Sequence, residues 1–502
     1  MTRTLRISAE HMRRFAAVSG DRNPLHADAA FARATPYGRP IAQGALVMIA
    51  ALAALDREAL ERVDTLNVQF KQAVFPDQDY TVALLDSAPG NARIDVVHEG
   101  RVAVAITCAF GREEPLPRVV AQPEALLRRS PANPTVEELA DGSRSFEEPY
   151  RADLDALVGL AEDLGAGHVP PSILLWLAAA SYTVGMIAPG EHAVFAGARI
   201  ASSASDRSGL LEGAVTTADE RMGLVNLEVT LHAQEASGAM ALQTFLRSPV
   251  PPPDRTSVGR YLAPSAELAG KNILVVGGSR GLGAALSGAF ATQGATVWAG
   301  FAQSVAYVER LRTEFGGETI QPLRFDASDP AEVRTGFASL RESVKTLDGV
   351  VLCAAPPLHE ASLHADASAS TVRFVDASVA MVLAPLAESL PVLSPDGWLV
   401  VVSSSAIEDP PEVWPHYVIA KSAVEGAAAY ARRFTNARVL VARPPTMWTD
   451  STNTPLARLG AVAAEQVAAA IVRWTLGEAV PDDEELLAGV RSGKIGSERA
   501  DS

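Results

Sequence analysis

Near its start the chain places an acid, an amide and an imidazole within six residues, in the stretch Ser19-Gly20-Asp21-Arg22-Asn23-Pro24-Leu25-His26. The glycine permits backbone angles that other residues resist and the proline fixes its own φ, so the stretch is typical of a rigid turn. A carboxylate near an imidazole can move protons close to neutral pH. Asp21 and His26 are therefore candidate catalytic residues, and Asn23 is expected to position Asp21 or a water molecule. An acid and an imidazole at this spacing also occur on ordinary protein surfaces, so the surrounding sequence must show whether this pair is catalytic.

A second set of residues could bind a phosphate and move a proton. The loop Gly277-Gly278-Ser279-Arg280-Gly281-Leu282-Gly283 follows a predicted strand and opens a predicted helix. Backbone N–H groups in such a loop and the positive end of the helix dipole bind a pyrophosphate. Tyr417 and Lys421 are four residues apart, so on a helix they share one face. The ammonium makes the phenol a better acid, which suits donation of a proton to a carbonyl.

The elements that must position the first set are one buried helix and an antiparallel sheet. A helix is predicted over Ala9 to Val18 and a long apolar one from about Ile41 to Leu60. Alternating residues predict four strands over 65–71, 79–87, 93–99 and 102–110. This plan repeats without the motif: an apolar helix over 173–187 is followed by strands near 193–200, 209–218, 224–234 and 239–247.

The second set belongs to a different kind of fold. Residues 113–150 show no sustained periodicity and are expected to be a connector, and Pro249-Val250-Pro251-Pro252-Pro253-Asp254 is a stiff spacer. Beyond the spacer, strands alternate with helices of ten or more residues, which predicts a doubly wound parallel sheet. The strands are expected over 272–277, 295–300, 322–326, 349–354, 398–403 and 437–442.

The first motif resembles a known family. Together with Gly38-Arg39-Pro40-Ile41-Ala42-Gln43-Gly44, the Asp21 to His26 stretch is similar to the MaoC-like, (R)-specific enoyl-thioester hydratases and dehydratases of the hot-dog fold. The resemblance implies a sheet wrapped around one helix and a site completed by two such units. It also implies that His26 and Asp21 share the proton transfers. Gly44 begins the long helix, so its N–H can stabilise the thioester oxygen, although close helix packing also explains a glycine there.

The second set resembles the short-chain dehydrogenase/reductases. Its glycine loop is joined by Ser404 and by Tyr417 and Lys421, in the family's order, and the resemblance implies that Ser404 orients the substrate oxygen. It implies further that Lys421 binds the nicotinamide ribose and that Asp326 contacts adenine. The segment Trp298 to Gln303 contains no acid for the ribose hydroxyls of NAD, whereas Arg280 can pair with a 2′-phosphate, so NADP(H) is favoured. The cofactor-binding residues are then expected to be Gly277, Ser279, Arg280, Gly281, Leu282, Gly283, Asp326 and Lys421.

Three positions depart from the reductase pattern. Ala354-Ala355-Pro356 stands in place of Asn-Ala-Gly, Ser378 in place of the usual active-site Asn, and Pro444-Pro445 in place of Pro-Gly. These departures leave open a reductase half that has lost activity. Gln43, where the first family often has His, leaves catalysis untouched but can alter substrate fit. In the second unit, Tyr182, Trp176 and His168 are candidates for an acyl tunnel or for plain core.

Composition excludes several function classes. A formal net charge of −16 argues against nucleic acid and against an anionic membrane, and the two apolar stretches over 41–55 and 173–188 are each shorter than the roughly 20 residues that a membrane span needs. The two cysteines, Cys108 and Cys353, have no Cys or His companions, which excludes a disulfide framework and a metal site and fits a reducing, cytoplasmic compartment. No secretory signal is recognisable after Met1. Short-chain reductases commonly form dimers or tetramers, so a homo-oligomer is compatible with the resemblance.

The sequence therefore predicts an α+β double hot-dog domain followed by an α/β Rossmann-like domain. The expected segments are a hot-dog unit with the motif, a connector, a motif-free hot-dog unit, a Pro-rich linker, the reductase domain and a tail, over 1–118, 119–150, 151–248, 249–268, 269–480 and 481–502. We expect a bifunctional enzyme that reduces a 3-oxoacyl thioester with NADPH and dehydrates the product, its substrate held on acyl carrier protein or coenzyme A. The alternatives are the reverse sequence, hydration then oxidation as in β-oxidation, and a dehydratase with an inactive reductase-like scaffold.

Overall fold

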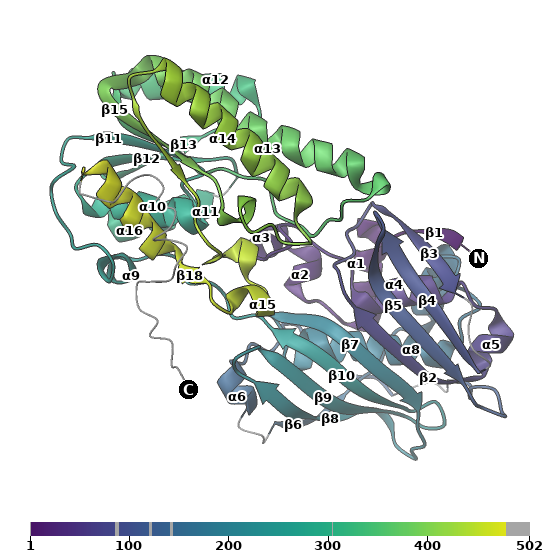
Figure 1. The fold of residues 1–502 in the computed structure, drawn as a ribbon. Coiled ribbons are helices and arrows are strands. Elements are labelled where there is room, and N and C mark those ends of the chain that lie inside the picture. Colours follow the sequence, from purple (N-terminus) through teal and green to yellow (C-terminus); the bar gives the residue numbers. More distant parts are fainter. Residues whose placement is uncertain (1, 86–89, 120–122, 141–143, 304, 478–502) are drawn as a thin grey trace, which may run out of the picture. The chain divides into compact units, whose positions relative to one another are not determined.

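The structure, a computed structural model, divides into two compact units. Unit 1 comprises Met1–Pro249 with Thr454–Leu456, and unit 2 comprises Val250–Asn453 with Ala457–Ser502 (Figure 1). The chain is described in five stretches, residues 2–85, 90–119, 123–140, 144–303 and 305–477. The expected tail, 481–502, lies outside the described residues.

Unit 1 is built on one antiparallel sheet of ten strands, in the order β1-β3-β4-β5-β2-β7-β10-β9-β8-β6. Leu66 of β2 pairs with Ile200 of β7, so the two predicted sets of strands form one continuous sheet. The edge strand β6 comes from the segment that we expected to be a connector, and it pairs with β8. The strands are β1 (Thr2–Arg6), β2 (Val63–Phe70), β3 (Asp79–Leu85), β4 (Asn91–His98), β5 (Arg101–Phe110), β6 (Ser145–Pro149), β7 (Ala193–Ser202), β8 (Ser208–Asp219), β9 (Leu224–Ala233) and β10 (Gly238–Leu246).

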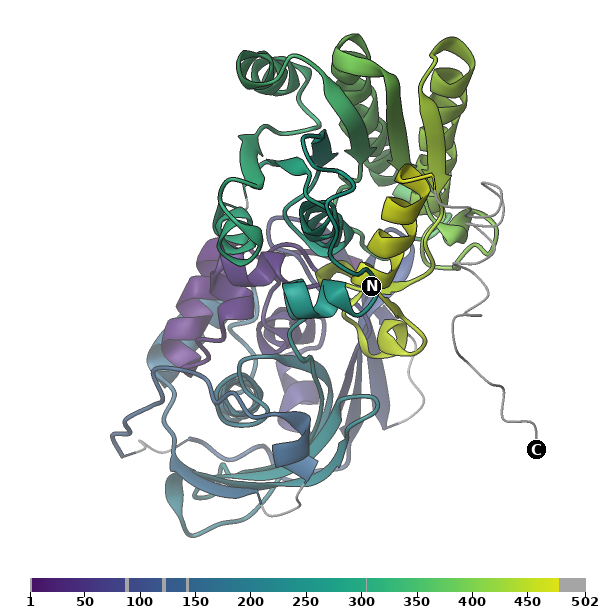
Figure 2. The ribbon, with the colours of Figure 1, turned by 90° about the vertical axis from the view of Figure 1, so that its left-hand side faces the viewer.

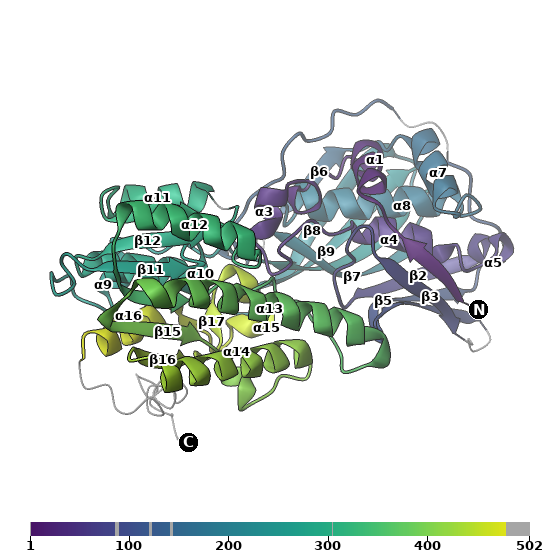
Figure 3. The ribbon, with the colours of Figure 1, turned by 90° about the horizontal axis from the view of Figure 1, so that it is seen from above.

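Two apolar helices, α4 (Gly44–Leu52) and α8 (Pro171–Tyr182), pack against each other on one face of this sheet (Figure 3). Each is hydrophobic on all sides and almost wholly buried, as expected of a helix enclosed by its own domain. Helix α8 continues into a π-helical segment, η1 (Thr183–Ile187). The remaining helices of unit 1 are α1 (Ala9–Ser19), α2 (Pro24–Ala27), α3 (Ala29–Arg33), α5 (Arg57–Glu61), α6 (Val136–Ala140) and α7 (Leu154–Asp163).

The prediction of one helix from Ile41 to Leu60 was wrong. Helix α4 ends at Leu52, and α5 begins only after Asp56, whose carboxylate accepts the backbone N–H of Ala59. An aspartate is favoured at a helix N-cap because its side chain satisfies a first-turn N–H. The apolar run therefore makes a short central helix and a separate turn of helix after it.

Unit 2 has a six-stranded sheet, all parallel, in the order β13-β12-β11-β14-β15-β16. Alternate residues of β11 face opposite layers: Ile273 and Val275 pack with α10, α11 and α16, whereas Leu274 and Val276 pack with α12, α13 and α14. Helices therefore cover both faces of the sheet (Figure 2), which confirms the predicted doubly wound, Rossmann-like fold. The strands are β11 (Asn272–Val276), β12 (Thr296–Phe301), β13 (Ile320–Arg324), β14 (Leu347–Leu352), β15 (Leu393–Val402) and β16 (Arg438–Ala442).

The longest helix of unit 2 is α13 (Ser368–Ser389), which with its flanking turns forms a continuous helical stretch from Ala365 to Val392. This stretch is long and apolar enough to cross a membrane, by length and composition alone. It packs on the sheet through Val382 and Leu386, so burial against the sheet accounts for part of its apolar surface. The other helices of unit 2 are α9 (Arg255–Gly259), α10 (Gly281–Thr292), α11 (Val305–Phe315), α12 (Pro330–Ser343), α14 (Pro415–Phe434) and α16 (Ala464–Thr475), and the short α15 (Pro455–Arg458) is divided between the two units.

Candidate functional site

The turn that carries Asp21, Asn23 and His26 begins where α1 ends. Gly20 takes a left-handed conformation, φ 81°, and its N–H donates to the carbonyl of Ala16 over 3.1 Å. A Cβ at this position would lie only 2.5 Å from Cδ1 of Leu127. Both the backbone angle and the lack of space therefore require glycine, and this residue sets the direction in which the chain reaches Asp21.

Asp21 is buried, with 2% of its surface exposed, and both carboxylate oxygens have donors. Its Oδ2 accepts the hydroxyl of Ser181 in α8 over 2.6 Å, and its Oδ1 accepts the backbone N–H of Asn23 over 3.2 Å. Within the described part of the chain, no hydrogen bond joins Asp21 to His26. The expected acid/base couple is therefore held by two separate sets of contacts.

Asn23 holds the turn against the segment that follows α8. Its Oδ1 accepts the N–H of Leu25 as the N-cap of α2, and its amide nitrogen donates to the carbonyls of Gly185, Gly190 and Glu191 over 3.1, 2.9 and 3.3 Å. The side chain is thus occupied by backbone contacts. We expected Asn23 to position either Asp21 or a water molecule. Because the side-chain amide of Asn23 already donates to backbone carbonyls, these contacts favour the first role.

The His26 imidazole has a fixed orientation. Its Nδ1 lies 2.7 Å from the carbonyl oxygen of Ile41, and a carbonyl oxygen only accepts, so Nδ1 carries the hydrogen. In the neutral ring Nε2 then has the lone pair. That atom is suited to take a proton from a substrate and to return it.

Gly44 is the first residue of α4, where backbone N–H groups have no partner within the helix. A Cβ at Gly44 would lie 2.7 Å from the ring of Phe70, so the neighbouring side chain closely covers this position. Gln43, the N-cap, donates from Nε2 to the carbonyl of Met12, while its Oε1 is buried without a hydrogen-bond partner. Gly44 is therefore closely packed, and its N–H also belongs to the first turn, where the helix itself provides no acceptor.

Two of the three tunnel candidates in the second half of unit 1, Trp176 and Tyr182, are packed into the core, and His168 is half-buried. Trp176 is fully buried and donates to the carbonyl of Ala236 over 2.8 Å, and His168 contacts the carbonyl of Leu55 over 2.7 Å. The Tyr182 hydroxyl accepts the N–H of Arg128 over 2.9 Å. Their polar atoms are satisfied by backbone, as in ordinary core residues.

The glycine loop of unit 2 forms a tight turn between β11 and α10. Gly277 has φ 81°, and a Cβ there would lie 2.8 Å from the backbone of Ala354. A Cβ at Gly283 would lie 2.0 Å from the carbonyl oxygen of Gly277, so strand and helix approach as closely as backbone permits. Gly281 begins α10 with φ 51°. The turn and the helix N-terminus thus have the shape that accepts a pyrophosphate.

Four other residues were expected to bind the cofactor, three within this loop and Asp326 outside it. Ser279 and Leu282 are buried, and Arg280 is the N-cap of α10, its guanidinium 5.9 Å from the ring centre of Tyr307. Asp326 has one oxygen, Oδ1, committed to the N–H and hydroxyl of Ser328. The residues present fit a dinucleotide: a glycine turn for the phosphates and a cation at the helix start.

Tyr417 and Lys421 lie on α14 as the spacing predicts, with the Lys421 ammonium 5.6 Å from the centre of the Tyr417 ring. Lys421 is buried and donates to the carbonyl of Val402, at the end of β15, over 2.8 Å. Ser404 follows that strand, and its hydroxyl accepts the N–H of Ala406. Its neighbour Ser403 is buried, with a hydroxyl that has no partner in the described structure.

Two departures from the reductase pattern have a structural counterpart. The Ser378 hydroxyl donates back to the carbonyl of Phe374 in its own helix over 2.7 Å, so it does not replace an asparagine amide. Pro356 lies in the loop after β14, two residues beyond the Ala354 that packs on Gly277.

The two cysteines offer no thiolate, because burial raises the pKa of Cys108 to about 12 and of Cys353 to about 11.

One polar residue beside the tyrosine was not predicted from the sequence. His416 is fully buried, and neither ring nitrogen has a hydrogen-bond partner among the residues that the structure describes. Its ring lies 4.4 Å from that of Phe374 and 4.7 Å from that of His359, centre to centre. Burial, and secondarily His359, lowers the pKa of His416 to about 4. The only signal in the sequence was its position next to Tyr417.

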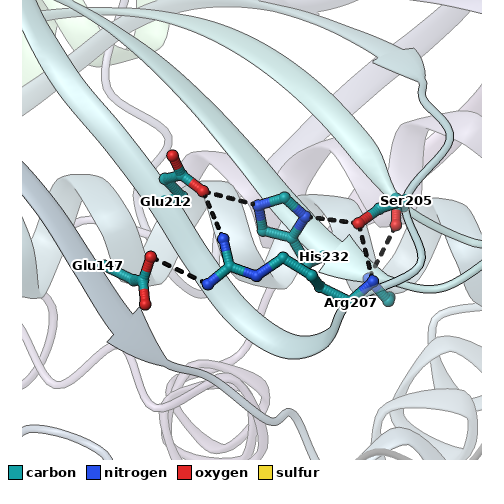
Figure 4. Close-up of polar contacts among 7 residues, drawn as sticks. Glu147, Ser205, Arg207, Glu212 and His232 are labelled. Atoms are coloured by element: carbon teal, nitrogen blue, oxygen red, sulfur yellow. Dashed lines mark hydrogen bonds and ion pairs between the residues drawn. The ribbon is translucent and has the colours of Figure 1, made fainter.

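A polar cluster on the sheet of unit 1 has a structural role, unlike the residues described above (Figure 4). Ser205 lies 2.7 Å from Nδ1 of His232, whose Nε2 lies 3.2 Å from Glu212, and Arg207 bridges Glu212 to Glu147. The Ser205 hydroxyl also accepts the N–H of Arg207. The charged members are exposed, and the contacts tie the edge strand β6 to β8 and β9, so we assign the cluster to sheet stability. No group of three metal-ligating side chains occurs among the described residues.

The fold and the two sites define a class: an enzyme that joins a hydro-lyase domain to an oxidoreductase domain. Family models agree with this division, since residues 1–107 match the MaoC like domain and residues 271–457 match the short chain dehydrogenase family. The chain is therefore a fusion of a MaoC-like domain and a short-chain dehydrogenase/reductase domain, which confirms the resemblance found in the motifs.

Solved structures match the dehydrogenase part. A dehydrogenase/reductase from Sinorhizobium meliloti 1021 is 23% identical over 43% of this chain and 90% of its own, with a TM-score of 0.39. A short chain dehydrogenase from Burkholderia cenocepacia J2315 in complex with NADP is 23% identical over 43% of this chain and 94% of its own, also with a TM-score of 0.39. Among curated proteins, none matches the chain.

Proposed function

We propose that the protein is a bifunctional 3-oxoacyl-thioester reductase and 3-hydroxyacyl-thioester dehydratase that produces a trans-2-enoyl thioester. In this proposal residues 1–118 and 151–248 are two hot-dog units, joined by 119–150, and 269–480 are the reductase domain after a linker at 249–268. The observation that carries it is the pairing of sites in one chain. An imidazole with its tautomer fixed lies in one unit, and a phosphate-binding turn with a Tyr/Lys helix lies in the other.

The two reactions are consecutive, which is why we pair them. Reduction of a 3-oxoacyl thioester yields the 3-hydroxyacyl thioester that a dehydratase consumes. Joining both sites in one chain raises the local concentration of the intermediate. We place the protein in fatty-acid-like or polyketide-like biosynthesis in the cytoplasm, with the acyl group on acyl carrier protein or coenzyme A.

In the dehydratase step His26 is the base. Its Nε2 takes the proton from C2, the C3–O bond breaks, and the imidazolium returns the proton to the departing hydroxyl, so that water leaves. Asp21 shares this proton transfer as a carboxylate held by its two donors. The Gly44 N–H, at the positive end of α4, stabilises the negative charge that develops on the thioester oxygen.

In the reductase step Tyr417 is the acid. Its phenol donates a proton to the 3-oxo oxygen, Ser404 orients that oxygen, and Lys421 binds the ribose and supports the phenol electrostatically. NADPH, when bound, supplies the hydride. The turn from Gly277 to Gly283 would hold its pyrophosphate, Arg280 its 2′-phosphate and Asp326 its adenine.

One observation favours a second reading, a dehydratase with an inactive reductase-like scaffold. Ser378 hydrogen-bonds its own helix, and the loop after β14 carries Pro356 where the family has glycine. Replacement of Tyr417 by Phe distinguishes the two readings. Loss of NADPH consumption with dehydration intact supports two working sites, whereas no change in any turnover supports the scaffold.

The direct test supplies the purified chain with NADPH and a 3-oxoacyl thioester, on coenzyme A and on acyl carrier protein in parallel. We expect NADPH oxidation and an enoyl product. If neither appears on either carrier, the proposal is wrong. A clear preference for NAD in a cofactor titration would instead support hydration followed by oxidation, as in β-oxidation.

A further inference from the structure

We infer that Ser181 and the π-helical segment η1, from the half of unit 1 that lacks the motif, position Asp21 for dehydration. This inference rests on the proposed dehydratase function. It assigns to the motif-free half of unit 1 a defined part in the site, which no motif in that half predicts.

The first support is the hydrogen bond between Ser181 and Asp21. Its length is 2.6 Å, and the two residues expose only 4% and 2% of their surface, so water does not compete for it. A hydrogen bond to a charged, buried carboxylate is stronger than one between neutral groups. It fixes one oxygen of Asp21, while the N–H of Asn23 fixes the other.

The choice of partner distinguishes Ser181 from other helical hydroxyls. Thr183, two residues later, donates to the carbonyl of Ala179 in its own helix, and Ser378 and Ser389 in unit 2 do the same four residues back. That is the usual behaviour of a buried serine or threonine in a helix. Ser181 instead donates across to Asp21, 160 residues away in the sequence.

The second support is the π-helical segment itself. Runs of π-helix are rare and occur mostly at functional sites. All five residues of η1 are buried, and the segment meets the motif at three points. The carbonyl of Gly185 accepts the amide of Asn23, the sulfur of Met186 accepts the N–H of Arg22, and a Cβ at Gly185 would lie 2.2 Å from Oδ1 of Asp21.

These contacts give the segment a chemical purpose. Glycine at 185 leaves just enough room for the carboxylate, and the hydrogen bonds from Ser181 and Asn23 to its two oxygens fix its rotamer. A proton-transfer group must be held within about 0.5 Å of its working position. Ser181 and Gly185 are positioning residues in this sense, acting through Asp21.

The test measures dehydration and NADPH oxidation in the full chain with Ser181→Ala and Ser181→Cys, the latter being close in size but a weak donor. Ser172→Ala is the matched control, since Ser172 is buried in the same helix and its hydroxyl has no hydrogen-bond partner in the described part of the chain. We expect kcat for dehydration to fall about 10- to 100-fold with Ala and less with Cys, with KM nearly unchanged. Ser172→Ala should stay within about twofold of wild type.

Unchanged NADPH oxidation by each variant shows that unit 2 is folded and active. If Ser181→Ala misfolds unit 1, Ser181→Cys, which is close to serine in size, decides the question. The inference is wrong if the Ser181 variants match Ser172→Ala in kcat and KM for dehydration while the wild type dehydrates. A wild type without any dehydration would instead overturn the proposed function.

Discussion

The Nδ1 atom of His26 lies 2.7 Å from the carbonyl oxygen of Ile41, three residues before the start of α4. The motif and the entry to the buried helix are thereby joined by one contact. Because the carbonyl accepts, Nδ1 carries the hydrogen and Nε2 of the neutral ring keeps its lone pair. A single hydrogen bond thus selects both the orientation and the tautomer of the imidazole.

Replacement of His26 by alanine should remove dehydration and spare reduction. General acid–base groups contribute about 10²- to 10⁴-fold, and kcat for dehydration should fall by that factor. NADPH oxidation measured on the same sample should not change. His98→Ala is the control, since Nδ1 of His98 also lies against a carbonyl, that of Asp79 at 3.0 Å, but in β4, outside the motif. Equal losses in both variants would contradict a catalytic role for His26.

Replacement of Lys421 by methionine should affect only the reductase. The change keeps the length of the side chain and removes the ammonium beside Tyr417, so we expect NADPH oxidation to fall at least about 100-fold. Dehydration of a supplied 3-hydroxyacyl thioester should be unchanged. Lys271→Met, which removes an exposed ion pair with Asp348, is the control and should leave both rates intact. A Lys421 variant as fast as the control would favour the scaffold reading.

Much of the fold could be predicted from the sequence because its local patterns agree with its tertiary structure. Strands with period-two alternation and the βα repeats of unit 2 lie close to the expected residues. The edge strand β6 was missed because Ser145–Pro149 is short and polar, and its place in the sheet depends on contacts with residues distant in the sequence, such as its pairing with β8. Helix α5 was merged with α4 because hydrophobicity alone does not reveal the cap at Asp56.

The site was predicted only as far as its residues are near one another in sequence. Asp21, Asn23 and His26 form one motif, and Tyr417 and Lys421 form one helix face. Ser181 lies in an apolar helix with no motif, and only folding brings it to Asp21. No local pattern predicts such a contact.

Arg280 should control the choice between NADPH and NADH. It is the N-cap of α10, where a 2′-phosphate would meet both the guanidinium and the helix dipole. With Arg280→Ser we expect kcat/KM for NADPH to fall about 10- to 100-fold and that for NADH to change little. Arg310→Ser, on the neighbouring helix α11, is the control. A similar fall for both cofactors would show that Arg280 supports the fold of the loop and does not read the phosphate.

His416 should make unit 2 less stable in acid. Its pKa is about 4 in the folded protein, below the ordinary 6.5, because charging the buried ring is unfavourable. As the pH falls, His416 is therefore protonated in the unfolded chain before it is protonated in the folded one. The contribution of the neutral ring to the free energy of unfolding is complete above pH 6.5 and is lost as the pH falls from 6.5 toward 4. We expect a loss of roughly 1–3 kcal/mol across that window. Pulse proteolysis in urea at pH 8 and pH 5, which resolves the fragments of unit 2, measures it.

The variant His416→Phe then isolates this residue. Phenylalanine fills a similar space beside Phe374 and His359 and carries no ring nitrogens to leave unsatisfied, so unit 2 should be at least as stable at pH 8. It should lose less stability than wild type on going to pH 5. His364→Phe is the control, because His364 is exposed and pairs with Asp366. If both variants and the wild type respond alike to acid, the acid sensitivity of unit 2 arises from other groups.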